Sequence, residues 1–329
     1  MTIDLLGPVA YASFFLVMAL LNGVVCLGLN VQWGQTGLFN VGVAGFVAIG
    51  AYISALLTTP PSQEHLGGLA LPIFVGWIGA IIAGGGASAA IGALTLRLRA
   101  DYLAITTFGV AVVVQLVVLN AQRLTGGAFG IAFIPRPFES LTSSPALYDL
   151  ANLALVAAVV LAIFVALERL ARSPWGRVLR AIREDERAAM ALGKSSSRYR
   201  LQAFALGGAL MGLAGAMEAH FIGFIAPENY LSSLTFQVWA MLIVGGAGNN
   251  LGALLGAAVV WALWTVSGLA ISDMVPATYE ARAAALRLVA IGVLLATMIV
   301  VRPRGLIGER TLVSRHVGLG ARMRLHDKT

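Results

Sequence analysis

The side chains of this sequence that could carry out chemistry are few, and they do not gather into a catalytic pattern. The Gly-Lys-Ser tripeptide at 193–195 looks like the end of a phosphate-binding loop, but the motif also needs a glycine at Ala188 and a preceding strand. Glu218 and His220, near the end of an apolar run, lie two residues apart and so point to different faces of a helix, without further ligands. The single cysteine, Cys26, excludes a disulfide framework. We therefore expect no catalytic residue, no metal site and no cofactor.

Composition places these side chains in a membrane protein. Of the 329 residues, 59% are hydrophobic and 11% are charged, and the mean hydropathy is +0.86. Soluble domains have about a quarter of their residues charged, and a helix that crosses the hydrocarbon core takes about 20 apolar residues. We predict an all-α polytopic membrane protein with about nine membrane segments (eight to ten) within residues 1–301. The apolar runs cover 9–31, 37–58, 68–96, 102–120, 146–170, 201–225, 235–247, 251–271 and 283–301.

Basic residues predict the orientation of these segments. Nine lysines and arginines lie between Glu168 and Arg200, and the tail at 302–329 is also rich in arginine. Short basic loops stay in the cytoplasm, so the loop at 172–200 and the tail are predicted to be cytoplasmic, with the N-terminus outside. The net charge of +7 then reflects topology and attraction to anionic membrane lipid, and no nucleic-acid partner is expected.

The predicted cytoplasmic loop carries a helical pattern of its own. After Pro174, apolar residues recur at roughly helical spacing as far as Leu192, and Gly193 is typical of a helix end. We expect one or two short amphipathic helices, which can dock into a groove on a soluble partner. A solvated basic loop that only sets topology is the other interpretation.

Amides are the most suggestive polar groups within the membrane region. Asn30, Gln32, Gln35 and Asn40 surround a Gly-containing stretch at 30–37 that we expect to interrupt a helix. An interrupted helix exposes backbone groups that can line a path for a polar solute. Capping of a helix end explains these residues equally well, so both interpretations stay open.

Motifs spread over most of the chain resemble one family of transport proteins. Taken together they are similar to the LivM-type branched-chain amino acid permeases of ATP-binding-cassette (ABC) importers, although each glycine-rich piece is weak by itself. The segments that carry the resemblance are 29–35, 50–52, 101–105, 124–127, 176–193, 198–204, 212–220, 227–228, 245–248 and 302–306.

The resemblance implies a membrane-spanning permease subunit of the bacterial inner membrane, which is not itself an enzyme. It implies as partners a homologous LivH-like permease, two ATP-binding subunits that hydrolyse ATP, and an extracytoplasmic solute-binding protein. Coupling to the ATPases would use residues of the cytoplasmic loop, namely Arg180, Glu184, Glu186, Ala188, Ala189 and Gly193.

Two departures from the family pattern concern coupling and the solute. Arg187 stands where the general importer loop has a glutamate, and Val112 and Gln115 stand where the family commonly has an acidic and a basic residue. We expect a branched-chain or other apolar amino acid to pass near Asn30 to Asn40, with urea or short amides as alternatives. The competing class is a self-sufficient secondary transporter, which would favour ionised residues deep in the membrane.

Overall fold

The chain folds into a bundle of long helices. The structure, a computed structural model, describes residues 6–61, 67–141, 145–274, 280–302 and 304–309. Within these residues each predicted apolar run contains one long helix. The nine helices are α1 (Leu6–Leu29), α2 (Val43–Thr58), α3 (Ile73–Thr95), α4 (Ala100–Asn120), α6 (Pro145–Arg172), α9 (Ser196–Ile222), α10 (Ser232–Gly245), α11 (Asn250–Met274) and α12 (Glu280–Val301).

Six of the helical segments are long and apolar enough to cross a membrane. They begin in α1, α3, α4, α6, α9 and α11, whereas α2 and α10 are apolar but shorter. The described residues form no β-sheet and contain only an isolated bridge between Ile131 and Ile225. The protein is therefore an all-α polytopic membrane protein, as predicted, and the exact number of crossings stays a prediction.

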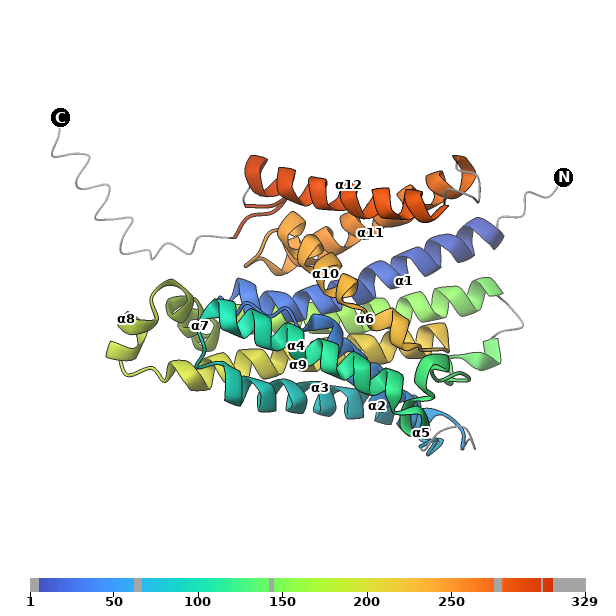
Figure 1. Ribbon diagram of the computed structural model, residues 1–329, viewed down its shortest axis with the longest axis horizontal. Helices are drawn as coiled ribbons and strands as arrows, with labels where there is room; N and C mark the ends of the chain where they lie inside the picture. The colour runs from blue at the N-terminus through green and yellow to red at the C-terminus, as the bar shows by residue number, and fades with distance from the viewer. Residues whose placement is uncertain (1–5, 62–66, 142–144, 275–279, 303, 310–329) are drawn as a thin grey trace.

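The ends of the bundle separate the connecting segments into two groups. Figure 1 shows the short helices α7 (Pro174–Glu184) and α8 (Glu186–Ala191) at one end, with the close of α12 toward the same end, and α5 (Gln122–Thr125) at the opposite end. This grouping is what the predicted topology requires. Which end faces the cytoplasm stays a prediction, and most of the predicted tail lies outside the described residues.

Helix α9 is the centre of the bundle, where it packs against α1, α2 and α3. Small residues make this close packing possible. A Cβ atom built on Gly84 of α3 would lie 2.6 Å from the carbonyl oxygen of Gly208, and one built on Gly212 would lie 2.6 Å from that of Ala80. In lipid, where no hydrophobic force drives helices together, such close backbone contact supplies much of the packing energy.

The first membrane segment is interrupted where the sequence predicts a break. Helix α1 continues into a π-helical turn, η1 (Asn30–Gly34), and the chain then runs without regular helix until α2 begins at Val43. Gly37 adopts a φ of +73°, in the left-handed region that favours glycine. The break lies at the same end of the bundle as α7, because Arg183 of α7 contacts its carbonyl groups.

Candidate functional site

The four predicted pathway amides come together at the break and are all buried. Asn30, Gln32 and Asn40 have 0% of their surface exposed, and Gln35 has 4%. The Asn30 side chain donates to Oδ1 of Asn250 at 2.9 Å and accepts from the backbone N–H of Gly248 at 2.8 Å. Both ends of this amide are therefore used to hold η1 against the start of α11.

Gln32 and Asn40 join the break to two further helices. Gln32 donates to the carbonyl oxygen of Phe204 in α9 at 2.8 Å, and its own oxygen accepts from Asn40 at 2.7 Å. Asn40 also accepts from the N–H of Gly42 at 2.8 Å, and its carbonyl accepts from the indole of Trp239 in α10 at 2.9 Å. Two of these bonds satisfy backbone groups that the interrupted helix leaves open, the N–H of Gly42 and the carbonyl of Asn40. The structure therefore supports the capping interpretation for Asn40, whereas Gln32 links the break to α9.

We expect replacement of Asn30 by alanine to destabilise the bundle. The change leaves the partly buried N–H of Gly248 and Oδ1 of Asn250 without their partner, at about 1–3 kcal/mol for each unsatisfied group. Unfolding of the detergent-purified protein should occur at lower denaturant. The matched control is Asn120→Ala, since Asn120 is exposed and bonds only within its own helix. Equal midpoints for the two variants would contradict the structural role.

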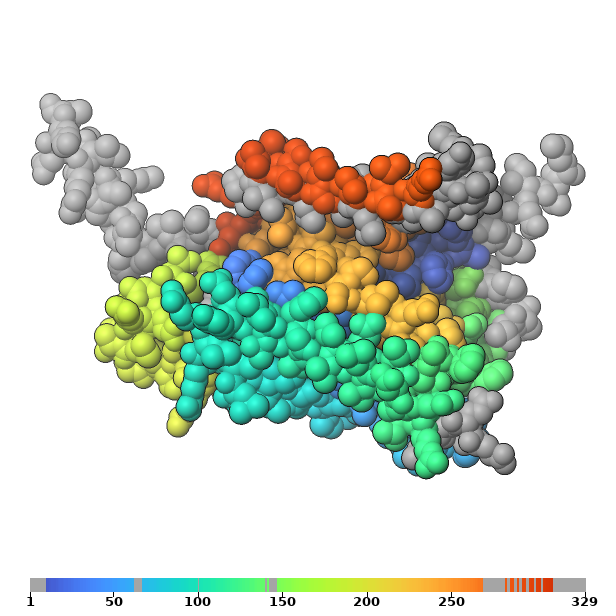
Figure 2. All heavy atoms as spheres, viewed as in Figure 1, coloured from blue at the N-terminus to red at the C-terminus, as the bar shows by residue number. Residues whose placement is uncertain are grey.

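The two short helices predicted after Pro174 are present. Gly176, Leu179 and Ile182 of α7 face the bundle and are buried. Asp185 then takes an extended conformation, with φ −151° and ψ 99°, and its side chain accepts from the N–H of Ala188 at 3.0 Å to cap the new helix α8. Helix α8 therefore starts in a new direction and projects from the end of the molecule, as Figure 2 shows in yellow-green.

The predicted coupling residues do not form one continuous surface. Ala188 and Gly193 are exposed, whereas Ala189 is 4% exposed, so a charge placed at Ala189 would disrupt the helix pair rather than report on docking. Leu192, at the end of α8, is 80% exposed. Met190, which the sequence did not single out, is 49% exposed. We call Ala188, Met190, Leu192 and Gly193 the α8 tip.

Two of the predicted glutamates form ion pairs within this region. Glu186 accepts from the hydroxyl of Ser196 and pairs with Arg200 at 3.3 Å. Glu184 pairs with Arg183 at 2.8 Å. Glu186 thus joins α8 to the beginning of α9, Glu184 pairs within α7, and neither belongs to the α8 tip.

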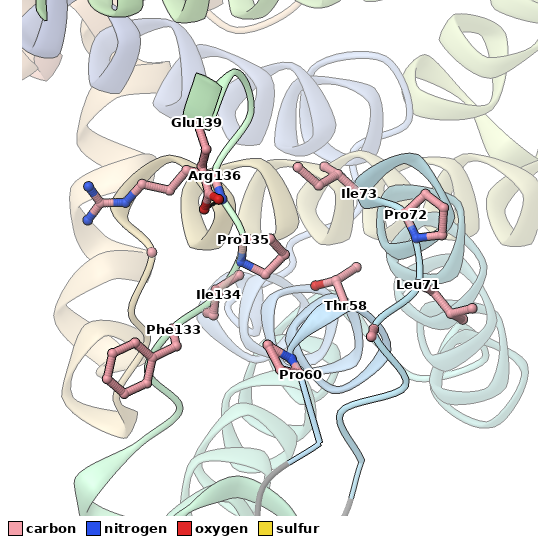
Figure 3. A pocket seen from close by; sticks show the side chains of 12 residues that line it. Thr58, Pro60, Leu71, Pro72, Ile73, Phe133, Ile134, Pro135, Arg136 and Glu139 are labelled. Carbon is pink, nitrogen blue, oxygen red and sulfur yellow. Dashed lines mark hydrogen bonds between the residues drawn. The ribbon is translucent and has the colours of Figure 1, made fainter. Parts of the chain in front are cut away.

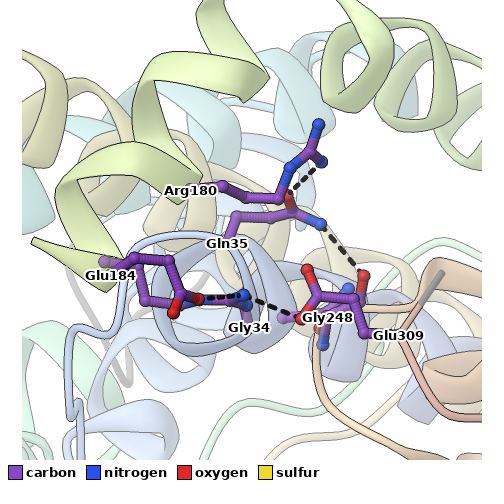
Figure 4. A network of polar contacts seen from close by, with 8 residues as sticks. Gly34, Gln35, Arg180, Glu184, Gly248 and Glu309 are labelled. Atoms are coloured by element: carbon purple, nitrogen blue, oxygen red, sulfur yellow. Dashed lines mark hydrogen bonds and ion pairs between the residues drawn. The ribbon is translucent and has the colours of Figure 1, made fainter. Parts of the chain in front are cut away.

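Arg180 and Arg183, three residues apart on α7, reach back to the helix break. Arg183 donates to the carbonyl of Gly34 and pairs with Glu309, beyond α12, at 2.8 Å. Arg180 donates to the amide oxygen of Gln35 at 3.4 Å. Figure 4 shows this network around Gly34 and Gln35. We call the contacts of Arg183 with Gly34 and Glu309 the Arg183 clamp.

The acidic partners of Arg183 keep its guanidinium charged. Burial by itself would lower the pKa of Arg183, but hydrogen bonds and charges from Glu309 and Glu184 outweigh burial and raise the pKa. The guanidinium therefore stays protonated. The spacing of Arg180 and Arg183 could have identified them as one helix face, whereas no local signal in the sequence points to Glu309.

The side chains of Glu218 and His220 point to different parts of the bundle, as their spacing predicts. His220 is fully buried and contacts Oγ of Ser54 at 2.9 Å and the carbonyl of Pro135 at 2.8 Å. Glu218 instead lines a small cavity between α1, α9 and α10. In the part of the chain that the structure describes, no three His, Cys, Asp or Glu residues gather at metal-binding distance.

The end of the molecule opposite α8 is hollowed. A cavity of about 1000 Å³ lies between the loop after α2 and the segment that follows α5. Figure 3 shows Phe133, Arg136 and Glu139 on one side of it and Pro60 and Pro72 on the other. Arg136 is held by the carbonyl of Ile222, and Phe133 is 87% exposed. This surface presents aromatic and charged groups beyond the apolar helices.

The sequence of this chain matches a known protein family. Residues 11–301 match the family described as branched-chain amino acid transport system / permease component. The chain belongs to this permease family. The resemblance to LivM-type permeases drawn from the motifs is thereby confirmed. No solved structure matches the chain.

Several relatives illustrate the relationship. The chain is 37% identical over 280 residues to the high-affinity branched-chain amino acid transport system permease protein LivM of Escherichia coli K12, covering 76% of this chain and 61% of that one. A probable LivM of Methanocaldococcus jannaschii is 28% identical over 343 residues, with 95% and 96% coverage. LivH of Salmonella typhimurium LT2 is 24% identical over 251 residues, with 72% and 78% coverage. The chain spans about three fifths of the length of the two bacterial LivM proteins it matches.

Proposed function

We propose that this chain is the membrane-spanning permease subunit of an ABC importer in the bacterial inner membrane. Its solute is a branched-chain or other apolar amino acid, by similarity to the LivM relatives. The observation that carries the proposal is the connection from an exposed apolar tip on α8, through the arginines of α7, to the break in the first membrane segment. A partner that pushes on this tip can therefore move the membrane helices.

The permease would contribute no chemistry of its own. ATP-binding subunits dock at the α8 tip, and their closure on ATP displaces α8 and α7. The Arg183 clamp passes this displacement to η1 and to the segment after α12, so that the bundle changes between inward and outward access. ATP hydrolysis takes place entirely on the two partner subunits.

The remaining partners follow from the same assembly. A LivH-like permease completes the membrane part, and a solute-binding protein delivers solute at the end opposite α8. The hollow between Pro60, Phe133 and Arg136 supports this assignment, since it offers an open rim with aromatic and charged groups. Membrane lipid covers the outward faces of the helices.

The solute pathway runs beside the break, and the amides there act indirectly. In Asn30, Gln32 and Asn40 both the amide N–H group and the amide oxygen already bond to protein partners. They position the interrupted backbone, and the movement of that backbone opens or closes the path. A zwitterionic solute, with no net charge, suits a route with little charge in mid-membrane.

Purification of the tagged chain from its native membrane, followed by reconstitution into vesicles, tests the proposal. Two ATPase subunits and a second permease should co-purify, and leucine loaded on the solute-binding protein should stimulate both ATP hydrolysis and uptake. Vesicles with an ATPase subunit inactivated in its phosphate-binding loop are the control. Stimulation by urea or short amides alone would change the solute class. Uptake by this chain without ATPase subunits would instead indicate a secondary transporter.

A further inference from the structure

A second cavity lies next to the helix break, at the end of the molecule that carries α7 and α8. Its volume is about 460 Å³, within the range of about 300–1,000 Å³ that small-molecule sites occupy. The end of α6, helix α7, the start of α11 and Glu309 all contribute to its walls. Gln35, beside the break, is the fifth part of the chain in its wall, and the cavity is large enough for a small metabolite.

The charges around this cavity balance one another. Its ionic side chains are two arginines, Arg172 and Arg180, and two glutamates, Glu168 and Glu309, with Gln35 and Asn249 as neutral polar neighbours. A simple anion would meet the two carboxylates, and a simple cation would meet the two guanidiniums. A molecule with both charges on groups attached to one carbon, such as a free amino acid, complements both signs.

Two groups in the wall have unused hydrogen-bonding capacity. Nη2 of Arg180 is buried and has no hydrogen-bond partner among the described residues, and its Nη1 makes only the long 3.4 Å contact to Gln35. Glu309 uses Oε2 for Arg183, and its Oε1 accepts nothing from the part of the chain described. A buried donor left without an acceptor costs about 1–3 kcal/mol, so Arg180 calls for an acceptor that the protein does not supply.

Opposite charges lie on either side of Gln35 in the wall of this cavity (Figure 4). In Figure 4 Arg180 and Glu309 lie on opposite sides of the Gln35 amide, whose Nε2 donates to the carbonyl of Gly248 at 3.3 Å. The other two ionic side chains, Glu168 and Arg172, form an ion pair with each other, with 2.7 Å between Oε1 of Glu168 and Nη2 of Arg172. The groups with unused hydrogen-bonding capacity are thus one guanidinium, which suits a carboxylate, and one carboxylate, which suits an ammonium group.

We infer that this cavity binds a free zwitterionic amino acid, with the carboxylate on Arg180 and the ammonium group on Glu309, and that the bound amino acid slows import. The inference rests on the proposed function for its solute class and for its access from the cytoplasm. Arg180 belongs to α7 and Gln35 to the break, the two parts whose relative movement couples ATP use to transport. A ligand that bridges them favours one arrangement over the other, so the imported product limits its own uptake.

Binding to the complete importer, purified without its solute-binding protein, is the direct test. L-Leucine should bind, whereas isovalerate, which lacks the ammonium group, and isoamylamine, which lacks the carboxylate, should bind at least about tenfold more weakly, since each loses one charged contact worth about 1.4 kcal/mol or more. Equal binding of isovalerate would indicate an anion site and would overturn the inference.

A cavity-filling variant separates this site from the transport path. Ala171 lines the cavity, so Ala171→Leu should abolish leucine binding here, and Phe164→Trp fills it from another wall if the first variant does not assemble. Ala166→Leu, at an exposed position of the same helix, is the matched control. Leucine binding that survives both filling variants would overturn the inference.

The functional readout is the ratio of uptake with and without leucine inside the vesicles, each variant compared with itself. We expect at least about a fivefold reduction in wild type and in Ala166→Leu, the lower end of usual coupling strengths, and less than half of that effect in Ala171→Leu. Import without any inhibition by internal leucine would contradict this inference alone. Absence of import in every preparation would contradict the proposed function, and the binding measurements would still decide the site.

Discussion

Replacement of Arg183 by glutamine should lower solute uptake at least about tenfold while the assembled ATPase subunits still hydrolyse ATP. Arg183 joins α7 to the carbonyl of Gly34 in the break and to Glu309. Glutamine is shorter and uncharged, so it cannot hold both partners. The ATPase subunits would still bind and push, but the push would no longer reach the membrane helices.

The size of this effect follows from the burial of the pair. Side chains of Arg183 and Glu309 are 22% and 30% exposed. Breaking a fully buried pair costs about 3–5 kcal/mol, and the partial exposure here reduces this to roughly half. Since about 1.4 kcal/mol corresponds to a factor of ten, a tenfold loss of coupling is a cautious expectation.

Arg177→Gln is the matched control for the clamp. Arg177 lies on the same helix, is exposed, and donates only to the carbonyl of Arg172 at 3.2 Å. Uptake and ATP hydrolysis measured in the same vesicles should remain linked in this variant. If Arg183→Gln keeps the normal ratio of uptake to ATP hydrolysis, the clamp does not transmit the movement.

Hydropathy predicted where the apolar helices lie, because each apolar run contains one. The helix boundaries were less predictable, as the second run shows. It begins at residue 37 in the sequence, but α2 begins at Val43. The intervening chain is held by contacts from elsewhere, for example the hydroxyl of Thr107, which accepts from the N–H of Val41 at 3.0 Å. Such contacts leave no trace in a local hydrophobic pattern.

The break itself was predictable, whereas the partners of its amides were not. Amides and glycines at 30–37 interrupt an apolar run, and this local pattern predicts a defect in the helix. Asn30 bonds to Asn250, and Gln32 bonds to Phe204, at separations of 220 and 172 residues. Only the packed bundle reveals that these amides serve the protein itself.

The direction of α8 was also beyond the periodicity of the sequence. The helical spacing of apolar residues from Val178 to Leu192 leaves open whether one helix or two follow Pro174. The extended backbone of Asp185 ends α7 and starts a separate helix, so the two segments do not share one face. Leu192, at the end of α8, is therefore 80% exposed as part of the α8 tip.

That exposure leads to the second large effect. Leu192→Asp should reduce binding of the ATPase subunits at least about 100-fold, with loss of uptake to match. Burying a leucine side chain in an interface contributes about 1.5–3 kcal/mol, and an unpaired carboxylate placed there adds a desolvation cost. A total of about 2.7 kcal/mol already amounts to a factor of 100. Co-purification of the ATPase subunits with the tagged permease measures this binding directly.

The chain offers a closely matched control at its other end. Leu69 is 61% exposed, and it precedes α3 in the group of segments opposite α8, so Leu69→Asp introduces the same charge on a similar surface without touching the α8 tip. Leu69→Asp should retain its ATPase subunits in full. Because Leu192 contributes little to the packed core, Leu192→Asp should unfold at the same denaturant concentration as the wild type, which separates docking from folding. Normal co-purification of Leu192→Asp would show that the ATPase subunits bind elsewhere. The α7–α8 segment would then be a basic loop that only sets the membrane topology.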